Sequence, residues 1–211
     1  YHPKILDAVE DLIGPNIRIL SSTVFPKMPG DGTFVDWHQD GTYFALDPDN
    51  KQVAAWVGLS DAPIEAGCME MAIGSHKLGQ LSHAEVASEK HMLSLGQTVN
   101  SEFSKEKTEF TPVNAGQMSL HHTHTIHRSG PNTASYRRVG VTLTYVPAHV
   151  RVRVGVSPSA ALVRGSDSWG HFIDEPRPKI DFGNEELEFQ KYANDLFKAV
   201  YAEERKRYSN V

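Results

Sequence analysis

The stretch RRVGVTLTYVPAHV, residues 137–150, carries the strongest strand signal in this chain of 211 residues. Val139, Val141, Leu143 and Tyr145 occupy every second position, and alternate residues of an extended chain share one face. The stretch therefore predicts a long strand that contributes one face to a hydrophobic core.

Further apolar runs lie on both sides of this strand and are separated by turn-forming residues. They are IRILSSTVF (17–25), VAAWVGLSD (53–61), GCMEMAIGSHKLG (67–79), EFTPV (109–113), GQMSLHH (116–122) and THTIHRSG (123–130). Apolar residues at helical spacing occur only near the two ends, in residues 4–13 and 185–207. Many short strands and few helices predict a mainly β fold, a sandwich or barrel with peripheral α-helices.

Two segments lack a clear period. Residues 80–107 are polar, and we expect them to form an excursion over the functional site that is partly helical. Residues 147–180 contain several prolines and are expected to form irregular coil. The predicted organisation is a single domain, 1–211, with its core at about 17–150 and a C-terminal coil and helix at 151–211.

Composition limits the classes of partner and compartment. The formal net charge of -5 gives no general attraction to phosphate backbones, so we expect no nucleic-acid partner. No apolar run reaches the roughly 20 residues of a membrane-spanning helix, so we expect no membrane partner. Cys68 is the only cysteine, which excludes an internal disulfide and indicates a cytoplasmic protein. The chain starts at Tyr1, which leaves room for a further N-terminal portion, and its oligomeric state is not predicted.

His38 and Asp40 lie two residues apart in VDWHQDGTYFAL, residues 35–46. Two histidines and one carboxylate on one face are the ligands of non-haem Fe(II) oxygenases, and they leave other coordination positions open. A strand end or tight loop lets both side chains of His-x-Asp point the same way. A third ligand has to come from elsewhere, and the histidine-rich segment 121–127 offers His121, His122, His124 and His127.

Three stretches together resemble the phytanoyl-CoA dioxygenase family of Fe(II)/2-oxoglutarate-dependent oxygenases. They are WHQDGTYF (37–44), AGCMEMAIGSHKLG (66–79) and HRSGPNTASYRRVGVTLTYVP (127–147), and the resemblance covers roughly residues 17–150. It implies a double-stranded β-helix, the jelly-roll or cupin-like core. It also implies that His38, Asp40 and His127 bind the iron.

The resemblance further assigns the cosubstrate site. The family places the arginine that binds 2-oxoglutarate 11 residues after the distal histidine, which is Arg138 here. A guanidinium binds a carboxylate through two parallel hydrogen bonds. Ser129 matches a position whose hydroxyl helps to hold the same carboxylate, and Trp56 resembles a tryptophan beside the cosubstrate, although a core role explains Trp56 equally well.

Other polar residues near these positions receive no firm role from the sequence. Ser22, Thr23 and Lys27 precede the His-x-Asp loop and could line the cosubstrate end. Arg137 is expected to face outward, and His76 and Lys77 of the GSHKLG loop are expected to be structural.

The expected reaction is hydroxylation of a small molecule, with Fe(II), 2-oxoglutarate and O2 as cofactors and with release of succinate and CO2. Related halogenases replace the carboxylate ligand with alanine or glycine, so Asp40 favours hydroxylation. The substrate could be free or linked to CoA or a carrier protein. The alternative is a cupin-like barrel without oxygenase activity, which binds another metal or a sugar.

Overall fold

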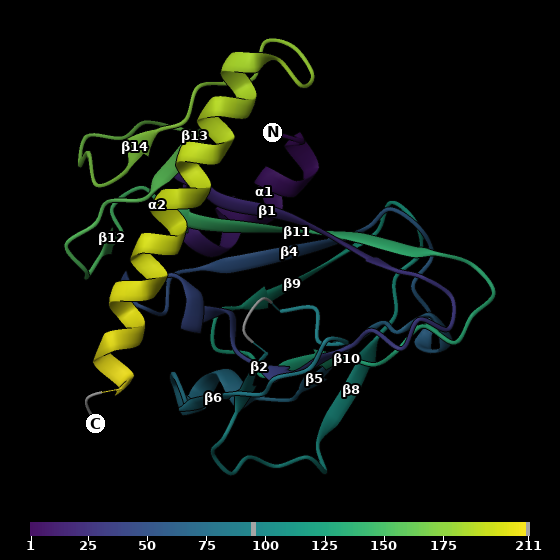
Figure 1. Ribbon diagram of the computed structural model, residues 1–211. Helices are drawn as coiled ribbons and strands as arrows, with labels where there is room; N and C mark the ends of the chain where they lie inside the picture. The colour runs from purple at the N-terminus through teal and green to yellow at the C-terminus, as the bar shows by residue number, and fades with distance from the viewer. Residues whose placement is uncertain (94–95, 210–211) are drawn as a thin grey trace. The chain divides into compact units, whose positions relative to one another are not determined.

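The computed structural model describes residues 1–93 and 96–209 and consists mainly of β-strands (Figure 1). Its described α-helices are α1 (Pro3–Ile13) and α2 (Asn184–Ser209). The strands are β1 (Ile17–Lys27), β2 (Val35–His38), β3 (Leu46–Asp47), β4 (Val53–Gly58), β5 (Met69–Ala72), β6 (His83–Glu85), β7 (Gln97–Val99), β8 (Thr108–Thr111), β9 (Met118–His122), β10 (His127–Ser129), β11 (Arg138–Pro147), β12 (Arg151–Val152), β13 (Ser159–Arg164) and β14 (Ile173–Asp174). Each apolar run named above contains a strand.

The chain divides into two compact units that interleave along the sequence. The first unit comprises Tyr1–Ser21, Tyr43–Val53 and Thr144–Val211, and the second comprises Ser22–Thr42 and Ala54–Leu143. Strands β1 and β11 have residues in each unit, and within the first unit β13 pairs with both β1 and β14. The single domain expected from the sequence stays a prediction.

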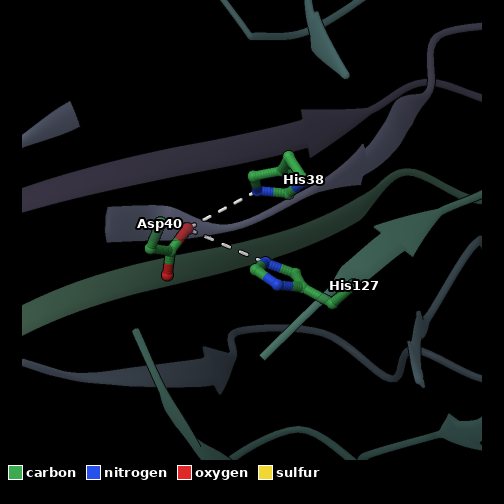
Figure 2. Close-up of side chains that lie close together, drawn as sticks. All are labelled: His38, Asp40 and His127. Atoms are coloured by element: carbon green, nitrogen blue, oxygen red, sulfur yellow. Dashed lines mark ion pairs between the residues drawn. The ribbon is translucent and has the colours of Figure 1, made fainter. Parts of the chain in front are cut away.

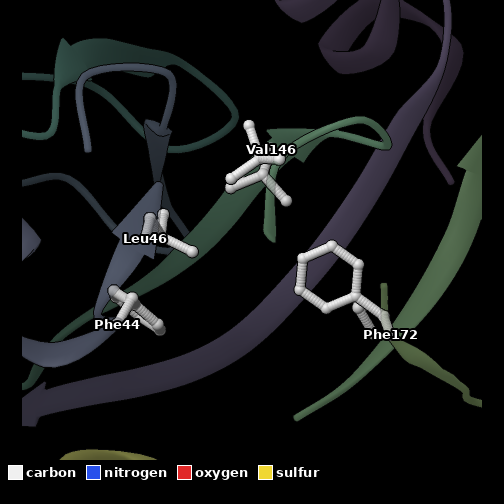
Figure 3. Close-up of a cluster of buried hydrophobic side chains, with 6 residues drawn as sticks. Phe44, Leu46, Val146 and Phe172 are labelled. Carbon is white, nitrogen blue, oxygen red and sulfur yellow. The ribbon is translucent and has the colours of Figure 1, made fainter. Parts of the chain in front are cut away.

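The first unit has its own hydrophobic core, which contains Phe44, Leu46, Val146 and Phe172 (Figure 3). Its helix α1 begins with Pro3 in its first turn, where a missing N–H costs no hydrogen bond, and it buries Leu6 and Val9. Helix α2 packs against β13 (Figure 1). No helix in the described part of the chain combines the length and apolar character that crossing a membrane requires.

The expectation of irregular coil at 147–180 is wrong, because this segment contains β12, β13 and β14. Strand β13 pairs antiparallel with β1 in the first unit, where Ile17 lies opposite Arg164 and Ile19 opposite Ala161. Pro158 and Gly165 bracket this short strand in the sequence. Because strand pairing with β1 supplies its hydrogen bonds, nothing within the segment itself reveals it.

The second unit contains a four-stranded antiparallel sheet with the order β2-β10-β5-β8, together with β4 and β9. Trp56 of β4 packs in one buried cluster with Cys68 and with Met69 of β5. Trp37 of β2 belongs to a second buried cluster with Ile126. These clusters fix the strands that carry the functional residues.

Residues 80–107 belong to the second unit and pack near β2. They contain the antiparallel pair β6–β7, and the described residues of the segment contain no helix, so the expected helical portion is not found there. Residues 94 and 95 lie outside the described residues. His91 forms a bridge with Phe34, next to the start of β2. The segment therefore supports the strand on which His38 lies.

Candidate functional site

His38, Asp40 and His127 come together in the second unit (Figure 2). Strand β2 ends at His38, and a 3-10 turn begins at Asp40. His127 starts β10 and lies directly opposite His38 in the antiparallel pair. The Asp40 Oδ1 atom lies 3.5 Å from His38 Nε2 and 3.8 Å from His127 Nε2. One ligand atom from each residue lies within 4.8 Å of the other two, so the three residues could hold one metal ion.

The two imidazoles are oriented by the same backbone contact. In each ring Nδ1 lies 2.9 Å from the carbonyl oxygen two residues earlier, which is Asp36 O for His38 and Thr125 O for His127. A carbonyl oxygen only accepts, so Nδ1 carries the proton and donates it. Both Nε2 lone pairs then remain available for a metal ion, as in protein sites where the second ring nitrogen is held by a backbone carbonyl.

The charge states of these groups suit a divalent cation. Burial and the neighbouring His38 hold the pKa of His127 well below its usual range, so this imidazole is neutral at neutral pH. Burial raises the pKa of Asp40, but the neighbouring His127, His121 and His38 outweigh burial and hold that pKa well below its usual range, so the carboxylate is ionised. Neutral imidazoles and an ionised carboxylate are the ligand types of non-haem Fe(II) sites.

Gln39, between the two candidate ligands, points away from them and anchors the loop. Its buried amide Nε2 donates to Gly79 O at 2.9 Å and to His124 O at 2.7 Å, while its Oε1 accepts from Leu81 N at 2.7 Å. Its backbone N–H donates to His83 Nε2 at 3.0 Å. Burial lowers the pKa of His83 to about 4, so that ring is neutral and Nε2 can accept.

His121 is a further residue that contacts the candidate site. Its Nε2 atom lies 3.1 Å from Oδ2, the second carboxylate oxygen of Asp40. The His121 ring lies 4.6 Å from the His127 ring between centroids. The sequence offered His121 only as one of four possible ligands and gave no sign of this contact, which depends on the placement of β9 relative to the turn at Asp40.

His122 and His124 do not join this group. The His122 ring lies 5.2 Å from the His124 ring and 5.8 Å from the exposed His76 between centroids. The side chains of His76 and Lys77 are exposed, and their expected structural role stays a prediction. Among the described residues, His38, Asp40 and His127 form the one group that satisfies the distances for a metal ion.

Two cations are buried at the start of β11 and the end of β1. Arg138 is 2% exposed and Lys27 is 0% exposed, whereas Arg137 faces outward as expected. The Arg138 guanidinium donates hydrogen bonds to the backbone oxygens of Gly67 at 3.1 Å, Phe25 at 3.3 Å and Ala66 at 3.5 Å. Neither cation pairs with a carboxylate in the part of the chain that the structure describes.

Such a pair of cations is costly without a counter-ion, because burial disfavours charge. Burial, then the charge of Arg138, lowers the pKa of Lys27 to about 7. Burial also lowers the pKa of Arg138 to about 10. The arrangement therefore fits a bound carboxylate, which would restore the charge balance.

Ser129 connects the cations to the candidate metal site. His127 and Ser129 are alternate residues of β10, and both are buried while Arg128 between them is exposed. The Lys27 ammonium donates to Ser129 Oγ at 2.7 Å, to Ser129 O at 3.0 Å and to Gly130 O. Because alternate residues share a face, Ser129 and its Lys27 partner lie on the same side of β10 as His127.

Of the less certain positions, Trp56 lies next to the buried arginine. The Arg138 guanidinium carbon is 5.3 Å from the centroid of the Trp56 ring, which also packs in the core of the second unit. Both roles considered for Trp56 are thus compatible with its place. Ser22 and Thr23 are exposed, whereas Lys27 is buried, and only the strand register distinguishes them.

Comparison with known proteins identifies the family of the chain. The family model of phytanoyl-CoA dioxygenase (PhyH) matches residues 1–140. Phytanoyl-CoA dioxygenase domain-containing protein 1 of Danio rerio is 32% identical over 140 residues, which cover 65% of this chain and 48% of that protein. The chain thus spans about half the length of the curated relatives that it matches.

Solved structures are also similar. The non-haem monooxygenase ThoJ, in its apo form, has 31% identity and a TM-score of 0.85, and the match covers 98% of this chain and 75% of ThoJ. The epimerase SnoN, solved with Fe3+, alpha-ketoglutarate and nogalamycin RO, has 25% identity and a TM-score of 0.59 over 72% of this chain and 59% of SnoN. The predicted jelly-roll core is confirmed. The resemblance seen in the sequence is confirmed as well: the chain belongs to the phytanoyl-CoA dioxygenase family, whose cofactors are Fe(II), 2-oxoglutarate and O2.

Proposed function

We propose that this chain is a 2-oxoglutarate-dependent hydroxylase in which His38, Asp40 and His127 bind Fe(II). The observation that carries the proposal is the convergence of two Nε2 lone pairs and one Asp40 oxygen from β2, the following turn and β10. Backbone carbonyls fix both rings, so the ligand atoms are held in place before a metal ion arrives.

The cosubstrate end of the proposed site is formed by Arg138, Lys27 and Ser129, with Trp56 beside the guanidinium. We propose that Arg138 and Ser129 bind the distal carboxylate of 2-oxoglutarate and that Lys27 contributes its positive charge. Among the described residues these two buried cations form no ion pair with a carboxylate, which supports this assignment. A dicarboxylate bound there would offset the cost of burying both charges.

Iron bound at this site would supply the activation of O2 for oxidation of a substrate C–H bond, with release of succinate and CO2. The protein's own contribution is to fix the ligands, to orient the cosubstrate through Arg138 and to keep the His127 imidazole neutral. Asp40 occupies the third ligand position, which supports hydroxylation over halogenation. The proposed substrate is a small molecule, free or linked to CoA or a carrier protein.

The test is an anaerobic titration of the purified chain with Fe(II) and then 2-oxoglutarate, followed by optical absorption. The proposal predicts a metal-to-ligand charge-transfer band in the visible range. After O2 is admitted, succinate forms in stoichiometric relation to the 2-oxoglutarate consumed. A screen of metabolite extracts for compounds that accelerate this turnover would identify the substrate class.

The matched variants are His127→Ala and Asp40→Ala, compared with Arg137→Ala on the exposed side of the same region. The first two should lose the absorption band and succinate formation, while Arg137→Ala should retain both. A folded wild-type protein that gives no band would refute the oxygenase. Unchanged turnover in Asp40→Ala would refute the ligand assignment.

A further inference from the structure

We infer that His121 is a positioning residue for Asp40: it holds one carboxylate oxygen by a hydrogen bond and leaves only the other oxygen for the metal ion. The inference rests on the proposed function, since it assigns the second contact of a proposed ligand. It concerns a residue on β9, outside the three proposed ligands.

The two oxygens of Asp40 have different surroundings. Oδ1 faces the rings of His38 and His127, at 3.5 and 3.8 Å from their Nε2 atoms. Oδ2 lies 3.1 Å from His121 Nε2 instead. One oxygen of the carboxylate therefore faces the proposed metal position, and the other contacts β9.

The direction of the His121 hydrogen bond follows from the acceptor. An ionised carboxylate can only accept, so His121 Nε2 carries the proton and donates it to Oδ2. The Nδ1 atom of the same ring is buried and has no hydrogen-bond partner among the described residues, and His121 as a whole is 6% exposed. The contact with Asp40 is thus the hydrogen bond that fixes this ring.

A second contact holds the turn of Asp40 near β9. The Gly41 backbone N–H donates to Thr123 O at 3.2 Å. A Cβ atom at Gly41 would lie 2.4 Å from Gln80 Oε1 and 3.0 Å from Thr123 Oγ1, so a larger residue there would displace these side chains. Because the backbone is held to the loop after β9, His121 and Asp40 keep their relative positions.

The consequence concerns the number of open coordination positions. A carboxylate that binds through both oxygens takes two positions, whereas one that binds through Oδ1 alone takes one. Facial-triad sites need the remaining positions for cosubstrate and O2. The hydrogen bond from His121 therefore preserves an open position, and His121 itself does not bind the metal ion.

The test uses Co(II) as a probe of the full chain, with its affinity and its visible absorption spectrum as readouts. His121→Leu removes the donor, and His121→Gln retains an N–H near the position of Nε2. Loss of a residue that orients a metal ligand typically weakens metal affinity 10–100-fold. We expect that loss for His121→Leu together with an altered Co(II) spectrum, and we expect His121→Gln to restore both.

His122→Leu is the control, because it makes the same change on the neighbouring residue of β9 and outside the candidate group. This variant should bind Co(II) with an affinity within about 3-fold of wild type, a much smaller change than the loss expected for His121→Leu. X-ray absorption of bound Co(II) should count two imidazoles in both wild type and His121→Gln.

Three imidazoles in wild type and two in His121→Gln would overturn the inference, because His121 would then be a ligand. Equal affinity and equal spectra in wild type and His121→Leu would overturn it as well. Failure of the proposed function looks different: wild type would then bind no Co(II), or would bind it equally well after His38→Ala.

Discussion

Lys27 gives a quantitative test, because its ammonium is buried beside a second cation. Its pKa is lowered from 10.5 to about 7, first by burial and then by the charge of Arg138. In the unfolded chain Lys27 regains its ordinary pKa and binds a proton throughout the range from 7 to 10. The unfolded state thus binds more protons, and the free energy of unfolding rises with pH.

The size of the effect follows from the shift. Each unit of pKa difference corresponds to about 1.4 kcal/mol. Below pH 7 both states hold the proton and the full penalty is present, whereas above about 10.5 neither state does and the penalty is gone. Between pH 7 and pH 10 the Lys27 contribution to the free energy of unfolding should rise by about 3 kcal/mol.

The assay is urea unfolding of wild type and Lys27→Met at several pH values between 7 and 10. Methionine keeps the apolar stem and removes the charge, and groups that titrate elsewhere cancel in the difference between the two proteins. The stability of Lys27→Met relative to wild type should therefore fall by about 3 kcal/mol as the pH rises. A difference that stays constant across this range would show that Lys27 carries no desolvation penalty.

Three further changes test other parts of the structure. Arg138→Gln removes the positive charge that we propose binds the distal carboxylate of 2-oxoglutarate. Because a charged hydrogen bond contributes about 1.5–3 kcal/mol, isothermal titration should show a 10–100-fold lower affinity for 2-oxoglutarate and an unchanged affinity for Co(II). Loss of Co(II) binding would contradict this role. Gly140→Ala would place a Cβ 2.1 Å from the buried Trp56 ring, so urea unfolding should show a loss of about 1–3 kcal/mol, and an unchanged midpoint would contradict the close packing. Arg18→Met leaves the buried Asp167 carboxylate without its partner at 2.6 Å and should cost about 3 kcal/mol in the first unit, whereas a loss below about 1 kcal/mol would show that the ion pair contributes little.

The hydrophobic pattern predicted both helices and the longer strands, because their burial has a regular period. It did not predict β13, whose six residues are defined by pairing with β1 and are bracketed by Pro158 and Gly165. Very short strands such as β12 and β14 contain too few residues to show any period.

The candidate site also has one part that the sequence predicts and another part that it does not. His38, Asp40 and His127 follow from residue type, spacing and family resemblance, and the structure brings their side chains together. The buried position of Lys27 and the contact of His121 with Asp40 depend on strand register and on distances between segments far apart in the chain. No local pattern in one sequence contains that information.

The pairing of β2 with β10 has a consequence for how this stretch can vary. His127 lies opposite His38, but Ser129 lies opposite Val35, so β2 carries one residue more than β10 between these two pairs. In a strand, a shift of one residue sends every following side chain to the opposite face. Deletion of Arg128 would therefore make His127 and Ser129 direct neighbours and send their side chains to opposite faces of β10, even if every remaining side chain were kept. Substitutions can accumulate in this strand, but its length is fixed, and tolerated insertions and deletions are expected in the connecting loops instead.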